Sequence, residues 1–142
     1  MTDFRMSEAE RLAFLAEQRV GVIAIERPDA PPLAVPVWYG LTDSGAVTVW
    51  TERGTLKDRC LRAAGRFTLA VQDERPPYGY VSVAGPAEIR ESVTADDIRP
   101  IVARYVPADE VESHLADAFN DRAVLVTMQP ARWYTADYRK SE

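Results

Sequence analysis

The feature that most constrains this chain is a pair of alternating apolar segments separated by a short turn. Residues 33–41 and 46–51 each place apolar side chains at every second position. The intervening Asp-Ser-Gly at 43–45 is typical of a tight hairpin. Strands joined so closely pair antiparallel. The chain therefore has to bury the apolar face of an antiparallel sheet.

Four more segments read as strands. They are apolar or alternating and rich in β-branched or aromatic residues, and they cover residues 20–26, 67–73, 78–91 and 122–134. Within the longest of them, Gly85-Pro86 is expected to make a bulge or a bend. Six antiparallel strands predict a mainly β fold, a six-stranded β-barrel with peripheral helices. A closed barrel also removes exposed strand edges.

Helices are expected outside the strands. Ser7 and Glu10 have the spacing of a capping box. The expected helical regions are residues 1–18, 55–64, 94–105 and 109–120. The barrel then occupies residues 19–135, with 136–142 as a tail, so that 1–142 forms a single domain.

Composition narrows the classes of function. The net charge of -5 argues against a general nucleic-acid or anionic-membrane binder, since such proteins are usually basic. The single cysteine, Cys60, cannot form an intrachain disulfide and fits a reducing compartment. The apolar runs are too short to cross a bilayer, and the first residues lack the apolar core of a signal peptide. A cytoplasmic protein is expected. No metal-ligand spacing appears.

The stretch following residue 50 carries the strongest sign of a ligand. A strand ends at Thr51, Gly54 permits a sharp turn, and Thr55 can cap the helix that follows. Helix N-termini attract anions, yet Lys57 and Arg59 place cations there, against the helix dipole. Such cations make sense if they hold a phosphate, with Arg59 gripping two oxygens. The alternative is a plain capping box of Thr55 and Asp58 with solvated cations.

An ordered series of segments resembles the pyridoxamine 5'-phosphate oxidase-like split barrels, and is closer to their flavin/deazaflavin oxidoreductase branch. The series covers nearly the whole chain, and no single motif in it is diagnostic. Its members are AVPVWY at 34–39, WT at 50–51, the turn with Lys57 and Arg59, LR at 61–62, FTLAV at 67–71, PYGYVSVAG at 77–85 and DRAVLV at 121–126.

This resemblance implies a homodimer that binds FMN or the deazaflavin coenzyme F420 at its interface. Lys57 and Arg59 inherit the phosphate, and Thr51 contacts the phosphate or the ribityl chain. Thr55 departs from the family, which has a serine or often an arginine there; the departure weakens the grip and leaves the cofactor open. The backbone of the strand that carries Val37 and Trp38 would lie along the isoalloxazine ring of the cofactor.

Aromatic residues supply further candidates for the cofactor site. The resemblance implies that Tyr78, Tyr80 and Trp133 approach from the partner subunit or cover the ring. Trp50 lies opposite the valines of its strand, where it can meet the cofactor or the partner. Packing in the core or the dimer is the alternative for about half of the large aromatic residues.

The expected function is an oxidoreductase in which the cofactor carries hydride to or from a small unsaturated substrate, without a catalytic side chain. A carrier or sensor that binds the cofactor without turnover is the alternative. A purely structural dimer would show its groove filled by Trp38, Trp50 or Arg53. Some relatives bind haem, but the lone His114 is expected on a solvated helix surface, which favours the flavin or deazaflavin.

Overall fold

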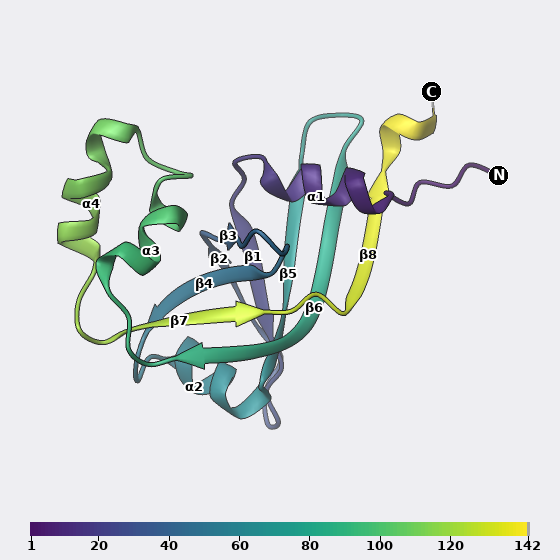
Figure 1. The fold of residues 1–142 in the computed structure, drawn as a ribbon. Helices are drawn as coiled ribbons and strands as arrows, with labels where there is room; N and C mark the ends of the chain where they lie inside the picture. Colours follow the sequence, from purple (N-terminus) through teal and green to yellow (C-terminus); the bar gives the residue numbers. More distant parts are fainter. Residues whose placement is uncertain (142) are drawn as a thin grey trace.

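The computed structural model describes residues 1–141, which form an antiparallel sheet with helices at its periphery (Figure 1). The strands are β1 (Gly21–Ile25), β2 (Leu33–Val37), β3 (Gly40–Leu41), β4 (Val47–Glu52), β5 (Arg66–Asp73), β6 (Gly79–Arg90), β7 (Ala123–Met128) and β8 (Arg132–Asp137). The α-helices are α1 (Glu8–Ala16), α2 (Leu56–Ala64), α3 (Ala95–Val102) and α4 (Val111–Ala118). Short 3-10 helices cover Ala108–Glu110 and Tyr138–Ser141.

The strands run in the order β2-β1-β5-β6-β7-β4-β3, and β8 pairs with β6 beside this path. Every pairing is antiparallel. The two strands that end the path, β2 and β3, are separated in sequence only by Trp38-Tyr39. The sheet therefore curls back on itself and nearly closes, which confirms the mainly β, antiparallel split barrel.

The strand count differs from the expected six because two predicted strands are divided. The predicted strand 33–41 is interrupted at Trp38-Tyr39. Before this point it pairs with β1, and after it the chain pairs with β4. Residues 122–134 break at 129–131, where Pro130 has no N–H to donate to a ladder. After this break β8 runs on to Asp137, so the expected tail begins inside a strand.

The bend expected at Gly85-Pro86 is the point where β6 changes partners. Residues 79–86 of β6 pair with β5, and residues 87–90 pair with β7. The carbonyl oxygen of Gln129 packs against the bend, 1.8 Å from where a Cβ on Gly85 would lie. No side chain fits there without moving the backbone, so glycine is required for the strand to turn this corner.

Two hydrophobic clusters hold the helices to the sheet. The larger fills the barrel and includes Leu15 of α1 and Leu61 of α2. Figure 1 places these two helices at opposite ends of the sheet. The smaller joins α3 and α4 to the outer face of β4 and β7 through Trp50 and Leu125. No helix within residues 1–141 is long and apolar enough to cross a membrane.

The helices are shorter than the sequence predicts. The capping box at Ser7 is confirmed, and α1 starts immediately after it. The α3 helix ends at Val102, before the expected 105, and the region 109–120 begins as a 3-10 turn ahead of α4. Such differences lie at helix ends, where pattern is least informative.

Candidate functional site

The turn between β4 and α2, residues 51–59, is here called the turn site. Gly54 adopts a φ of 87°, a left-handed conformation that favours glycine. Thr55 is the N-cap of α2, and its Oγ1 accepts from Asp58 N at 3.3 Å. Thr51 is 8% exposed and its hydroxyl lies 3.3 Å from that of Thr55. Two threonine hydroxyls thus meet where the strand gives way to the helix.

Asp58, which the sequence suggests only as the capping-box partner of Thr55, organises this turn by accepting from Gly54 N and not from Thr55 N. Its side chain is buried, and Oδ2 accepts a hydrogen bond from Gly54 N at 2.9 Å. Oδ1 accepts from Nε of Arg62 at 2.8 Å. The spacing of Asp58 and Arg62, four residues apart on a helix, is the sequence signal for this pair.

Three of the four cations around the turn are engaged within the chain. Arg62 donates to both carboxylate oxygens of Glu91, at 2.8 and 3.0 Å. Arg53 contacts the same carboxylate at 3.3 Å. The exposed Arg59 folds back and donates from Nη1 to the carbonyl oxygen of Gly54 at 2.6 Å. Arg59 therefore stays beside the turn, as a phosphate ligand would have to.

Lys57 is the exception among these cations. Its side chain is half-buried and makes no hydrogen bond or ion pair within residues 1–141. Burial lowers its pKa from the ordinary value, because a desolvated ammonium group is disfavoured. The backbone N–H groups of Leu56 and Lys57 also find no acceptor in this part of the chain. The first turn of α2 thus carries an unpaired lysine and two free amides, a combination that suits a phosphate.

Trp38 and Trp50, two of the residues expected at the cofactor, lie beside the α3–α4 helices, whereas Val37 does not. Val37 is buried in the barrel core. Trp38 stacks on Tyr105, with ring centroids 4.9 Å apart and an interplanar angle of 8°. Trp50 packs against the smaller hydrophobic cluster. Both tryptophans are thus held by the helices, whereas Arg53 turns away to Glu91.

His114 is not the solvated surface residue that the sequence suggested. It is half-buried, and its ring lies 5.2 Å from the ring of Trp38. The sequence places His114 on α4 but carries no signal that this helix folds over Trp38. The histidine completes an aromatic stack with Trp38 and Tyr105.

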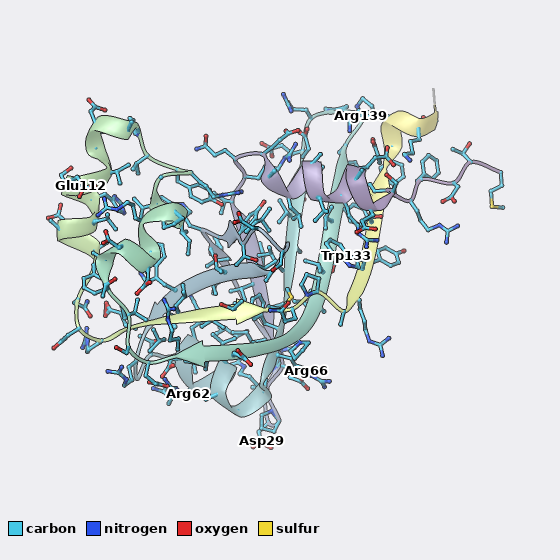
Figure 2. The ribbon with its side chains drawn as sticks, viewed as in Figure 1. Asp29, Arg62, Arg66, Glu112, Trp133 and Arg139 are labelled. Carbon is cyan, nitrogen blue, oxygen red and sulfur yellow. The ribbon has the colours of Figure 1, made fainter. Side chains whose placement is uncertain are left out.

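The remaining predicted aromatics lie at the α1 end of the sheet. Tyr78 stacks with Tyr80 at 6.1 Å, and Trp133 lies beneath the guanidinium of Arg11. A cavity of about 440 Å³, here called the aromatic pocket, is lined by Phe4, Arg11, Tyr80, Trp133, Tyr134 and Tyr138 among others. Figure 2 shows Trp133 beside β8 and Arg62 near α2, at the other end. One chain therefore does not bring these aromatics to the turn site.

Comparison with known proteins gives the family. The family model described as pyridoxamine 5'-phosphate oxidase matches residues 7–136. No curated protein matches the sequence at a significant level.

Solved structures share the fold over nearly the whole chain. A conserved hypothetical protein from Mycobacterium tuberculosis is 27% identical with a TM-score of 0.82, over 99% of this chain and 91% of that one. A structure named F420 reductase is 22% identical with a TM-score of 0.68, over 86% and 94%. A FAD-binding protein from Mesorhizobium loti is 19% identical with a TM-score of 0.66, over 92% and 94%. Since the family model spans most of its length, this chain belongs to the pyridoxamine 5'-phosphate oxidase family.

Proposed function

We propose that this protein is an oxidoreductase that binds F420 or FMN with the cofactor phosphate in the turn site. The observation that carries the proposal is Lys57, a half-buried ammonium without a partner in residues 1–141. Each neighbouring arginine already forms an ion pair or donates to a backbone carbonyl oxygen. A phosphate would supply the missing anion and accept from the free amides of Leu56 and Lys57. Family membership, and a similar structure named F420 reductase, support the same assignment.

In this proposal the cofactor carries out the chemistry, and the residues of the turn site bind it. A bound flavin or deazaflavin supplies hydride transfer to or from a small unsaturated substrate. Lys57 neutralises the phosphate, Arg59 stands beside it, and Thr51 offers a hydroxyl at the end of β4. The spacing of Lys57 and Arg59 resembles the deazaflavin branch, so F420 is the preferred cofactor.

The proposal includes a homodimer, because the candidate residues lie at both ends of one sheet. The outer face of β1, β2, β5 and β8 exposes small or apolar side chains, among them Val22, Ala34, Ala70 and Tyr134. An exposed apolar face of this kind is typical of an interface. A second copy packed on it would carry its own Tyr80, which shares this face with Tyr134, towards the turn site of the first.

The test is a titration of the purified protein with F420 and with FMN, followed by cofactor fluorescence. One cofactor should bind with a Kd below about 50 µM. Lys57→Met should weaken binding about tenfold or more, because it removes a charge-assisted contact to phosphate. Lys140→Met is the matched control, since Lys140 already pairs with Glu10 at the α1 end.

Several outcomes would overturn parts of the proposal. Binding of neither cofactor rejects it, and equal losses in the two lysine variants reject the phosphate assignment. Binding without reduction of any enone or quinone favours a carrier or sensor. A haem absorbance band in the purified protein favours the haem alternative. Sedimentation as a monomer at micromolar concentration removes the dimer and half of the proposed site.

A further inference from the structure

The aromatic pocket is formed by segments from both ends of the chain. Phe4 O accepts from Asp137 N at 2.8 Å, and Met6 N donates to Oγ1 of Thr135 at 2.9 Å. These two bonds tie residues 4–6 along β8 and make one wall of the cavity. The wall is fixed by hydrogen bonds to a strand, so the cavity belongs to the fold.

The walls of the pocket are flat rings. Tyr80 and Tyr134 lie nearly parallel, with centroids 6.1 Å apart and an interplanar angle of 11°. Phe4 contacts Tyr138 at 4.9 Å. Tyr134 is 71% exposed in the single chain, so its ring is accessible to a ligand. A cavity of about 440 Å³ with such walls has the size and character of a small-molecule site.

Arg11 provides the charge in this pocket. Its guanidinium carbon lies 4.1 Å from the centroid of the Trp133 ring. Its Nε is buried without a hydrogen-bond acceptor, and its side chain forms no ion pair with residues 1–141. A buried donor that has lost water and gained no acceptor is unfavourable. The Nη groups of Arg11 are not among the buried unpaired atoms and make no hydrogen bond within residues 1–141, so they can donate to a ligand.

The other charged groups nearby are already neutralised. Arg5 and Asp3 pair at 2.9 Å, so the pocket keeps one uncompensated positive charge. The neighbouring rings desolvate Tyr80, and Tyr134 and Tyr138 oppose its ionisation further, which raises its pKa to about 12. The phenol therefore stays neutral and does not repel an anion.

We propose that the aromatic pocket binds a planar aromatic or conjugated carboxylate. The guanidinium of Arg11 donates to the carboxylate, and Tyr80 and Tyr134 hold the ring of the ligand. Trp133, on the opposite face of β8, supports the guanidinium. Binding requires only this chain. The role of the ligand as the substrate rests on the proposed function, in which Tyr80 approaches the cofactor held by the partner.

The experiment is calorimetric titration of the full chain, without cofactor, with 2-naphthoate and with its neutral isostere 2-naphthamide. Naphthoate should bind about tenfold more tightly or better, because only it offers a charged acceptor. Arg11→Met should abolish that preference while keeping an apolar group over Trp133. Arg5→Met is the matched control, because Arg5 is paired with Asp3 and should change affinity less than about threefold.

The results separate this proposal from the proposed function. No heat from either probe at about 1 mM, or equal affinities for the two, overturns the pocket. Equal losses in Arg5→Met and Arg11→Met also overturn it. Lys57→Met should leave naphthoate binding unchanged while weakening the cofactor. A chain that binds naphthoate but neither cofactor would retain the pocket and lose the oxidoreductase.

Discussion

The turn site and the aromatic pocket each hold one cation without a partner, but the chain builds them differently. The turn site comes from nine consecutive residues, and backbone amides, Thr55 and Asp58 fix its shape. The aromatic pocket joins Phe4 to Tyr138 and is shaped mainly by rings in contact. Hydrogen bonds fix atoms within tenths of an ångström, whereas ring packing tolerates sliding. The turn site should therefore be selective for phosphate geometry and the pocket more tolerant of ligand shape.

The largest expected effect would damage both regions at once, because Gly85→Ala disturbs β6, the strand that serves both. A Cβ at this position lies 1.8 Å from the carbonyl oxygen of Gln129, and backbone cannot yield as a side chain does. We expect a loss of about 3 kcal/mol or more in the free energy of unfolding. Urea denaturation followed by tryptophan fluorescence measures it. Wild-type stability in this variant would show that the corner of β6 is not clamped.

Asp58→Ala should separate the two regions. It removes the acceptor of two partly buried hydrogen bonds, from Gly54 N and Arg62 Nε, which at about 1 kcal/mol each should cost about 2 kcal/mol in urea denaturation. Cofactor affinity should fall with it, while naphthoate affinity should not. Asp58→Asn keeps an acceptor for Gly54 and serves as the milder control. A parallel loss of naphthoate binding would mean that the regions are coupled.

Glycine substitutions test the turn more finely. Gly54 and Gly65 have φ values of 87° and 67°, and a Cβ at either would meet no atom within 4 Å. Alanine at either position should therefore cost about 1 kcal/mol of unfolding free energy through backbone strain alone. Only Gly54→Ala should also weaken cofactor binding, since Gly65 lies at the far end of α2. Equal binding in both variants would remove the turn from the site.

The sequence predicts one of these regions better than the other. Turn residues and caps act over a few positions, so Thr51, Gly54, Thr55 and Lys57 could be selected by pattern. The burial of Asp58 could not, because it depends on how tightly Gly54 folds back. Strand alternation likewise predicts the barrel but not the partner change at Trp38-Tyr39, which depends on pairing with β1 and then β4.

Only part of the aromatic pocket could be predicted from the sequence. Tyr80 and Trp133 could be proposed from composition and resemblance. Arg11 was not, because on α1 it reads as an ordinary helical surface charge. Its contact with Trp133 spans more than a hundred residues of sequence. Long-range packing of this kind has no local signature, and only the folded arrangement shows that the cation lacks a partner.

The smallest expected effect is that of Lys57 on the stability of the free chain. Its dependence on pH should be opposite to that of cofactor affinity. Burial lowers the pKa of Lys57 in the folded chain, so the unfolded chain holds its proton to higher pH. Stability should therefore rise with pH between the lowered value and the ordinary 10.5. Below that window Lys57→Met should be more stable than the wild type by about 0.5 kcal/mol, and above it the difference should vanish.

Bound phosphate favours the charged form, so cofactor affinity should fall with rising pH through the same window. Lys57→Met should lack that component, because methionine does not titrate. Urea denaturation and cofactor titration from pH 7 to about 10.5 measure the two slopes, and the difference between wild type and variant cancels other titrating groups. Affinity that falls equally in both proteins would place the phosphate away from Lys57. Opposite slopes for stability and affinity in the wild type alone would identify this ammonium as the group that meets it.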